Sequence, residues 1–433
     1  MKPVDIAVVG AGAAGLMAAI AAARPPQLKD KPQILLLDTK SKIGAKILMS
    51  GGTRCNVTNK EVQPSDFQGG SSHFVKHILD AFTPHETLRF FKEIGVELVL
   101  EPTGKYFPAT CSAQTVLGAL MKEAKRLGIQ LKTGIRMTQI KKSGDGFHLI
   151  GDRGPVTGDK PRVTSLSSPF QVTAQKVILT TGGLSYPTTG SDGTGYGIAK
   201  SFGHTVVDTF PALTPLLAGE NPWKALTGIS VEAELSFFKK GKKQGKCRGP
   251  LLFTHFGFSG PAALDISRHF AAAKKEERPE ITASFLPQHH EASFHETLQS
   301  LQKENPNKRI KNILTGKFSL PERFVETLLK KINITGDEPI GKFPKESRHR
   351  MVRSLLHYPL EVTGVFGYKK AEVTAGGVDL KEVKVSTMES KLVDGLYFAG
   401  EILDVDGRIG GFNFQWAWST GAAAGRSAAE SLL

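Results

Sequence analysis

A glycine motif close to the start of the chain constrains its fold more than any other feature. The motif is GAGAAG at residues 10–15, and it directly follows an apolar run at residues 5–9 that is typical of a buried strand. An alanine-rich stretch continues to about Arg24 and predicts a helix, and a second apolar run at residues 33–38 predicts another strand. These elements form a βαβ unit, so the sequence predicts a Rossmann-like fold.

Three glycines and one acid within this unit fit a dinucleotide. Gly10 makes the tight turn after the strand, Gly12 lets a pyrophosphate approach the backbone, and Gly15 lets the helix pack on the strand. The pyrophosphate then meets the free N–H groups and the positive dipole end of the helix. Asp38 closes the second strand, where its carboxylate can accept hydrogen bonds from a ribose. These residues alone leave both NAD and FAD open.

A glycine-rich segment after the βαβ unit is the second feature that points to a ligand. Residues 44–59 are too small, polar and basic to pack a core, yet they carry no signature of disorder. We interpret them as a loop wrapped around a polar ligand, with Lys46 and Arg54 available for negative charge.

The end of the chain favours FAD over NAD. Residues 395–401 read as a short strand that ends in Gly400-Glu401, an arrangement that places a carboxylate on the ribitol chain in many two-part FAD folds. A helix is expected after Gly410-Gly411. Its N-terminus would point at the pyrimidine edge of the flavin and stabilise negative charge there in the reduced state.

The order of the expected elements indicates a Rossmann-like domain with an insertion. Helices are expected at residues 73–79, 83–94 and 112–127, strands at 130–134, 147–150 and 176–181, and a polar loop or hairpin arm at 151–168. We therefore expect an α/β, glutathione-reductase-like FAD-binding domain with one dinucleotide motif at residues 1–209 and 362–433. A β-rich, barrel-like insertion is expected at 210–288 and about 354–361, and a small helical insertion at 289–353.

Composition narrows the class of protein. The chain has 433 residues, of which 40% are hydrophobic and 22% charged, as in ordinary globular proteins of two or three domains. Its three cysteines, Cys55, Cys111 and Cys247, include no C-x-x-C pair, so we expect neither a metal site nor a dithiol centre. Sparse cysteines suit a reducing cytoplasm. Outside the glycine motif no segment reaches the roughly 18 apolar residues of a membrane span, so no membrane partner is expected.

The formal net charge of +15 favours polyanionic partners, and two segments concentrate it. One basic run lies beside Phe237 and Phe238, and the other lies on a helix expected at about residues 345–356. Candidate RNA contacts in the two segments are Lys239, Lys240, Lys242, Lys243, Lys246 and Arg248, followed by Arg348, Arg350 and Arg353. The alternative is that these side chains are ordinary solvated lysines and an amphipathic helix.

Five sequence blocks together resemble the YhiN/BaiN-type bacterial flavoproteins, a family of NAD(P)/FAD-dependent oxidoreductases, over essentially the whole chain. The blocks are GAGAAG at Gly10, SGGTRCNVTN at Ser50, TTGGLSYPTTGSDGTGYG at Thr180, LLFTHFGFSGPAALDIS at Leu251, and, from Thr374, TAGGVDL with STMESKLVDGLYFAGEILDVDG and GGFNFQWAWSTG. Two positions depart from the family pattern, which often has Glu where Asp38 stands and Gly where Thr53 stands. Either acid can hold a ribose, whereas Thr53 can alter the loop near the flavin.

The resemblance implies a set of FAD contacts on the matching positions. These are Gly10, Gly12, Ala14, Gly15, Asp38, Lys46, Arg54, Thr181, Gly182, Gly400, Glu401, Gly411 and Asn413. No second glycine motif follows a convincing strand, so the flavin is expected to take hydride from transiently bound NADH or NADPH.

The resemblance also points to two kinds of substrate with the same chemistry. One is the activated C=C bond of a steroid-like enone, and the other is a uridine of large-subunit (23S) ribosomal RNA, which becomes dihydrouridine. In both, flavin N5 gives hydride to the electron-poor carbon and a general acid protonates its neighbour. The basic segments favour RNA, presented as an unpaired or flipped base. Alternatives are a small-molecule enone reductase or amine-type oxidase, and a non-catalytic RNA-binding flavoprotein that senses redox state.

Two side chains are candidates for the proton donor. Cys55 lies in the loop expected to reach the flavin, although a lone buried cysteine is usually a packed side chain. His255 lies beside Phe256 and Phe258 in the Thr254–Pro261 block, and it could equally be a structural histidine.

Overall fold

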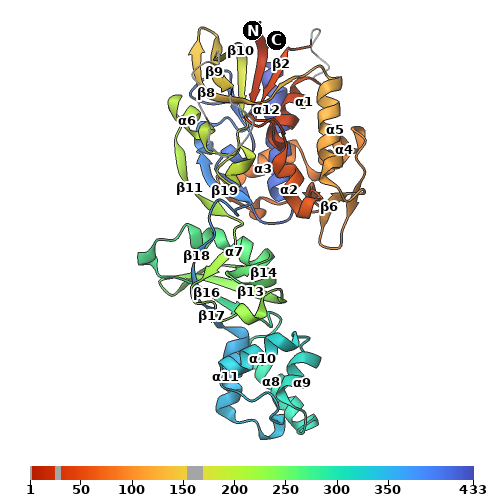
Figure 1. The fold of residues 1–433 in the computed structure, drawn as a ribbon, viewed down its shortest axis with the longest axis vertical. Coiled ribbons are helices and arrows are strands. Elements are labelled where there is room, and N and C mark those ends of the chain that lie inside the picture. The colour runs from red at the N-terminus through yellow and green to blue at the C-terminus, as the bar shows by residue number, and fades with distance from the viewer. Residues whose placement is uncertain (1, 25–30, 154–168) are drawn as a thin grey trace. The chain divides into compact units, whose positions relative to one another are not determined.

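The computed structural model describes residues 2–24, 31–153 and 169–433, which form two compact units. The first unit contains the chain up to Thr209 and from Glu372 to Leu433 (Figure 1). The second contains Phe210–Ala371.

A seven-stranded sheet forms the centre of the first unit. Six of its strands lie in the order β7-β2-β1-β10-β9-β8, and the seventh, β20, pairs with β10. Their bounds are β7 Gln130–Lys132, β2 Ile34–Leu37, β1 Val4–Val9, β10 Phe170–Leu179, β9 Gly146–Arg153, β8 Ile135–Ser143 and β20 Leu396–Phe398. Strands β7, β2, β1, β10 and β20 run parallel, whereas β8 and β9 form an antiparallel hairpin beside β10. Every residue of β2 is buried, as expected for a parallel strand covered on both faces.

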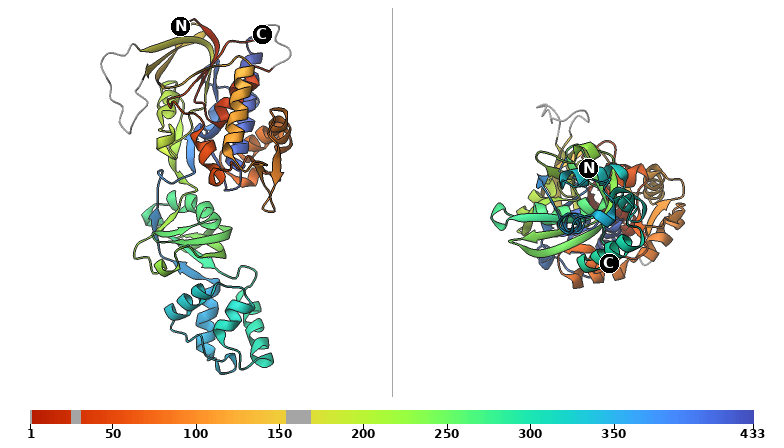
Figure 2. Two further views of the ribbon diagram at one scale, coloured as in Figure 1. Left: turned by 45° about the vertical axis from the view of Figure 1, so that its right-hand side comes forward. Right: turned by 90° about the horizontal axis from the view of Figure 1, so that it is seen from below.

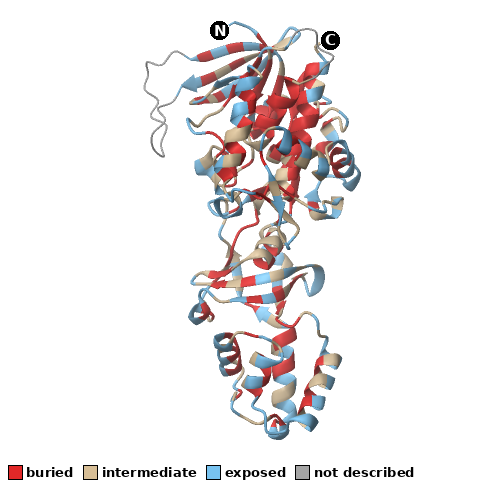
Figure 3. Cartoon of the chain, turned by 90° about the vertical axis from the view of Figure 1, so that its right-hand side faces the viewer, coloured by how far each residue is buried: buried red, intermediate tan, exposed pale blue. Residues whose placement is uncertain are grey.

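Two helices that are far apart in the sequence pack against each other on this sheet. They are α1 Ala13–Ala22 and α12 Phe412–Glu430, from opposite ends of the chain (Figures 1 and 2). A Cβ added at Gly425 of α12 would lie 2.1 Å from the carbonyl oxygen of Ala18, and one at Gly421 would lie 2.6 Å from that of Ala14. These distances show that the two helices approach closely because small residues face each other. Most residues of both helices are buried, and Figure 3 shows how buried residues are distributed over the chain.

The remaining elements of the first unit surround this core. Helices are α2 Ala45–Thr53, α3 Ser72–Ala81, α4 Pro84–Glu93, α5 Ala113–Arg126 and α6 Thr194–Ser201. Three small sheets pair β3 Thr58–Asn59, β6 Lys105–Pro108 and β5 Leu98–Leu100; β4 Phe67–Gly69 and β21 Val405–Gly407; and β11 Val206–Ala212 and β19 Val373–Val378.

The second unit is a seven-stranded sheet with helices. Its strand order is β17-β16-β13-β14-β15-β12-β18, with antiparallel neighbours. The strands are β12 Leu216–Ala218, β13 Ser230–Lys239, β14 Lys242–Thr254, β15 Gly257–Ser259, β16 Pro279–Ser284, β17 Tyr358–Leu360 and β18 Val362–Val365; the helices are α7 Pro261–Ala271, α8 Glu291–Glu304, α9 Ile310–Gly316, α10 Glu322–Lys331 and α11 Lys345–Leu356. Buried residues of the strands and helices form one core, in which Trp223 stacks on Phe324 of α10 at 6.1 Å.

Most elements agree with the sequence-based predictions, but residues 44–59 do not. The expected loop is wrong for residues 45–49, which form the helical part of α2 before the backbone leaves helical geometry at Ser50, Gly51 and Gly52. Of the loop expected at 151–168, residues 151–153 belong to β9, and 154–168 lie outside the described residues. The division of the insertion into β-rich and helical domains stays a prediction. None of the described helices is long and apolar enough to cross a membrane.

Candidate cofactor site

The five parallel strands of the central sheet end at one edge, and most of the predicted cofactor residues follow four of those ends. Gly10 follows β1, Asp38 follows β2, Thr181 follows β10 and Gly400 follows β20. Because parallel neighbours have their carboxyl ends on the same side, residues far apart in sequence converge there. In open α/β sheets this edge is where ligands bind.

The glycine turn leaves its backbone open at one position only. A Cβ at Gly10 would lie 2.4 Å from the carbonyl oxygen of Thr180, and one at Gly15 would lie 1.8 Å from that of Gly10. These two glycines are therefore required by packing. At Gly12, the N-cap of α1, an added Cβ would meet nothing within 4 Å. The open space lies at the N-terminus of a helix, which fits the approach of a pyrophosphate.

Asp38 is held by the turn that it faces. The Ala11 N–H donates to Oδ2 and the Lys40 N–H to Oδ1, each at 2.7 Å. Burial raises the pKa of Asp38, and these two backbone donors oppose the rise. Each carboxylate oxygen retains acceptor capacity, so the fixed carboxylate can still accept hydrogen bonds from ribose hydroxyl groups.

Glu401 is the centre of a polar cluster that joins three distant segments. Its Oε2 lies 2.5 Å from Nζ of Lys46, and its Oε1 accepts hydrogen bonds from the Ser185 hydroxyl and, at 3.0 Å, from the Thr374 N–H. Lys46 also donates to Ser185 Oγ at 2.7 Å. The Lys46 and Glu401 side chains are only 26% and 17% exposed, so the pair is largely shielded from water.

Sequence reasoning missed Ser185 and Thr374 as members of this cluster. The Thr374 hydroxyl accepts hydrogen bonds from the N–H groups of Leu184 and Ser185, at 2.7 and 3.0 Å, and so fixes the loop after β10. Both residues lie inside the sequence blocks that begin at Thr180 and Thr374. Their place in these blocks could have marked both residues as part of the site, but it does not show which side chains they contact.

The other predicted cofactor residues near the strand ends are mostly involved in packing. The Thr181 hydroxyl is buried, with no hydrogen-bond partner among the described residues, and a Cβ at Gly182 would lie 2.7 Å from Ser191 Oγ. A Cβ at Gly400 would lie 2.7 Å from the Ala14 Cβ, so this pair allows β20 to approach α1.

The start of α12 has a defined geometry. Its N-cap, Gly411, has a φ of 94°, in the left-handed region that favours glycine. The Asn413 side chain accepts from the Gly407 N–H and donates to the Gly407 carbonyl oxygen, both at 2.8 Å. Asn413 therefore fixes the turn between β21 and α12.

Arg54 forms an ion pair with Glu101, separate from the Glu401 cluster. Its guanidinium donates to Glu101 Oε1 at 2.6 Å and lies 4.0 Å from the centre of the Phe107 ring. A phosphate at Arg54 would therefore have to compete with Glu101.

The two candidate proton donors lie in different units. Cys55 belongs to the first unit, where its side chain is fully buried and burial raises the pKa of the thiol to about 12. His255 belongs to the second unit and is exposed in the turn between β14 and β15, with its ring 5.0 Å from that of Phe256. No structural observation joins either side chain to the Glu401 cluster.

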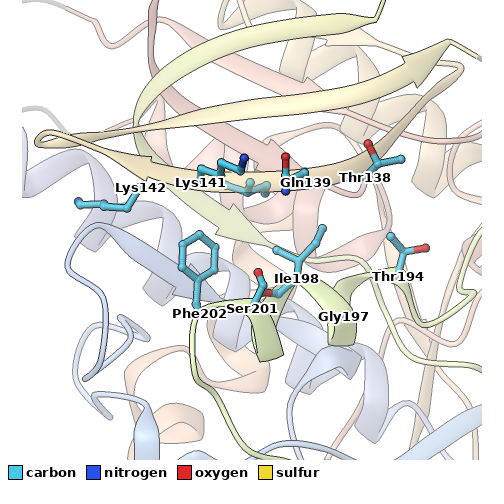
Figure 4. Close-up of a pocket in the computed structure, with 10 residues that line it drawn as sticks. Thr138, Gln139, Lys141, Lys142, Thr194, Gly197, Ile198, Ser201 and Phe202 are labelled. Carbon is cyan, nitrogen blue, oxygen red and sulfur yellow. The ribbon is translucent and has the colours of Figure 1, made fainter.

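A separate groove of about 770 Å³ lies between β8 and α6 (Figure 4). Residues 138–142 of β8 form one wall, and Thr194, Ile198 and Phe202 form part of the other. None of the residues that line it is a predicted cofactor residue, and the groove has no assigned role. The described residues contain no cluster of three or more side chains suited to a metal ion.

The basic run of the second unit forms the β13–β14 hairpin. Three of its side chains pair with acids: Lys239 with Glu277 at 3.0 Å, Lys246 with Glu234 at 2.9 Å and Arg248 with Glu232 at 3.7 Å. Lys240, Lys242 and Lys243 are exposed, and no ion pair within the described chain involves them. Phe237 is fully buried and cannot stack on a base, which removes part of the reason for expecting RNA here.

The three arginines of α11 differ in their surroundings. Arg348 is half-buried and donates to Gln302 Oε1 at 3.1 Å. Arg350 is exposed and makes a long contact, 3.4 Å, with the Asn333 carbonyl oxygen. Arg353 is exposed. Only the last two are therefore available to a large partner.

The residues at the sheet edge fit FAD. The open backbone at Gly12 suits the pyrophosphate, Asp38 suits the adenosine ribose, and the Glu401 cluster with the N-terminus of α12 suits the polar part of the flavin half. Together, the single glycine motif and the carboxylate after the last parallel strand define a Rossmann-type flavoprotein.

Comparison with known proteins identifies the group within this class. Residues 4–427 match the family described as HI0933-like protein Rossmann domain, and the chain belongs to this family. It is 34% identical to the 3-dehydro-bile acid delta(4,6)-reductase of Clostridium scindens over 98% of this chain and 99% of the relative. It is 32% identical to the ribosomal RNA dihydrouridine synthase of Escherichia coli (97% and 96% covered) and 33% identical to that of Haemophilus influenzae (96% of each). The protein is therefore an FAD-dependent reductase, which confirms the predicted fold class, the family and FAD as the cofactor. NADH or NADPH as the reductant stays a prediction.

Proposed function

We propose that this protein reduces a uridine of large-subunit (23S) ribosomal RNA to dihydrouridine, with NADH or NADPH as the reductant. The observation that carries the proposal is the charge of the second unit. Phe210–Ala371 contains 26 lysines and arginines against 16 aspartates and glutamates, so this unit has ten of the chain's fifteen excess positive charges. A small steroid needs no such surface, whereas a phosphate backbone does.

The chain's own residues hold the cofactor and the substrate. Gly12 and the N-terminus of α1 would bind the pyrophosphate of FAD, Asp38 would bind the ribose, and the cluster around Glu401 would orient the flavin half. Once reduced by NADH or NADPH, the bound FAD would supply a hydride to the electron-poor carbon of the substrate's C=C bond. In uridine this bond is conjugated with a ring carbonyl, as in an enone, so the same site can serve either substrate class.

The hairpin lysines are proposed to bind RNA phosphates. Among the described residues, Lys240, Lys242 and Lys243 form no ion pair, although the Lys274 N–H and, less strongly, the charge of Lys240 lower the pKa of Glu277. A phosphate would therefore not displace an existing ion pair there. Arg350 and Arg353 on α11 provide a second contact. The paired members, Lys239, Lys246 and Arg248, contribute less because Glu277, Glu234 and Glu232 already neutralise them.

The test is nucleoside mass spectrometry of large-subunit rRNA from the native host with and without the gene. We expect dihydrouridine to disappear on deletion and to return with the wild-type gene. A Gly12→Val gene should not restore it, because an added Cβ at Gly12 meets nothing within 4 Å and the side chain extends into the space left for the pyrophosphate. Gly118→Val is the matched control, because Gly118 also has open space around an added Cβ and lies on α5.

A competing function is reduction of a small enone, which the 34% identity to the bile acid reductase favours. Unchanged dihydrouridine after deletion, together with turnover of a steroid-like enone by the purified holoprotein, would replace the RNA proposal with this one. RNA binding without change of any nucleoside would instead indicate a non-catalytic sensor.

A further inference from the structure

Reduction of a C=C bond needs a proton as well as a hydride. Tyr186 is a third candidate for the side chain that donates this proton. It directly follows Ser185, whose hydroxyl group is bonded to Glu401 and Lys46. Its backbone therefore lies beside the cluster at the carboxyl ends of β10 and β20. This placement is independent of the two candidates from the sequence, Cys55 and His255.

The Tyr186 backbone is held in a costly conformation. Its φ and ψ are 46° and 66°, in the left-handed region that bulky residues avoid. The Thr189 N–H and hydroxyl both donate to the Tyr186 carbonyl oxygen, at 2.8 and 2.7 Å, and Pro187 follows. On the other side, the Ser185 N–H donates to Thr374. Strain that surrounding bonds impose in this way is typical of functional positions.

The side chain of Tyr186 is suited to donate a proton. It is half-buried, and within the described chain no hydrogen bond involves its hydroxyl group. Burial, with a smaller contribution from the Glu372 carboxylate, raises the pKa of the phenol, so the group stays protonated at neutral pH. By contrast, the Cys55 thiol is sealed in the core.

We propose that Tyr186 is the catalytic acid that protonates the substrate carbon next to the carbonyl group. This inference rests on the reduction of an activated C=C bond described above, but not on the choice between RNA and an enone. The Tyr186 Oη–H bond breaks as a C–H bond forms at that carbon, and the two electrons for the reduction come with the hydride at the neighbouring carbon. Water then returns a proton to the phenolate, so atoms and charge balance.

The test compares Tyr186→Phe with Tyr106→Phe, a half-buried tyrosine on β6 outside the site. FAD affinity and the rate of flavin reduction by NADPH should be unchanged in both variants. Reoxidation of the reduced flavoprotein by 2-cyclohexen-1-one or by rRNA should slow about 100-fold or more in Tyr186→Phe alone. In the wild type this step should be slower in D2O, and the slowing should disappear in the variant. Burial also raises the pKa of Tyr358 and Tyr397, so ultraviolet difference titration near 295 nm should count one fewer phenol ionising above the ordinary range in Tyr186→Phe than in the wild type.

Each outcome decides between the proposals. A Tyr186→Phe protein that is reoxidised at the wild-type rate overturns the role of Tyr186 and leaves the function intact. Loss of FAD or slowed flavin reduction in Tyr186→Phe also overturns it, because the effect would then be on cofactor binding. A wild type that reduces the enone but not rRNA overturns only the proposed substrate, and one that reduces neither overturns both.

Discussion

Nζ of Lys46 lies 2.5 Å from Oε2 of Glu401, although 355 residues separate the two in the chain. The contact ties α2 to the end of β20, so it connects the N-terminal and C-terminal parts of the first unit at the cofactor edge. Ser185 completes the cluster from the loop after β10. A cofactor that binds at this edge therefore meets a carboxylate whose position is already determined.

Removing the lysine should weaken FAD binding. In Lys46→Met the Glu401 carboxylate loses one of the three donors, and the one cation, that bind it among the described residues. Hydrogen bonds to charged groups contribute about 1.5–3 kcal/mol. We expect the dissociation constant of FAD to rise about tenfold or more, measured by the fluorescence of released flavin. Lys42→Met, an exposed lysine three residues before the start of α2, should have no effect. Equal affinity in the Lys46 and Lys42 variants would contradict this role.

Acid should destabilise the first unit through Glu123. Hydrogen bonds from Arg126 and Arg24 lower the pKa of this buried carboxyl from 4.5 to about 2. A lowered pKa in the folded state stabilises the protein above about pH 4.5, and this contribution is lost as the pH falls towards 2. Because Arg126 is exposed, we expect Glu123→Gln to cost only about 1–2 kcal/mol at pH 7. The difference from the wild type in urea unfolding should shrink at pH 3; a constant difference would refute the assignment.

The thiols should react in an order set by burial. Cys111 is exposed, whereas Cys55 is fully buried with its pKa raised to about 12, so Cys55 is neither accessible nor ionised at pH 7.5. We expect a thiol reagent to modify Cys111 rapidly in the native protein and Cys55 only after unfolding. Cys111→Ser should remove the fast phase, and mass spectrometry of peptides identifies each site. Rapid native modification of Cys55 would instead restore it as a candidate proton donor.

The free hairpin lysines should determine the salt dependence of RNA binding. Neutralising Lys240, Lys242 and Lys243 to glutamine together removes three proposed phosphate contacts. The slope of log K against log salt concentration should fall by roughly 2 units. The control removes the same charge from exposed Lys92, Lys122 and Lys125 in the first unit. Equal slopes for both triple variants would show that RNA binds through net charge rather than through the hairpin.

Much of the cofactor fold could be predicted because its signals are local. The glycine turn and the buried apolar runs of β1 and β2 occur within the first 40 residues, and a βαβ unit needs no distant partner to be recognised. The strand before Gly400-Glu401 and the helix after Gly411 could also be predicted, because Gly395 directly precedes the strand and Gly411 directly precedes the helix.

Residues 44–59 show where local reasoning failed. Small and polar residues predicted a loop, yet Ala45–Met49 form a helix because Ile47 is buried in the core and Lys46 is held by Glu401. The same segment contains Thr53, a departure from the family pattern visible in the sequence. Only the structure shows that Thr53 has a φ of 70°, a left-handed conformation that a β-branched residue avoids.

The sequence by itself determined the fold class, the position of the glycine turn and the concentration of positive charge, since each follows from periodicity or composition over a short stretch. The tertiary structure alone decided which polar side chains meet. It joined Lys46, Ser185, Thr374 and Glu401, paired Arg54 with Glu101, and sealed Cys55 in the core. The physical reason is that hydrogen bonds and ion pairs act over about 3 Å, whereas their partners are separated by up to 355 residues and meet only when the parallel strands align.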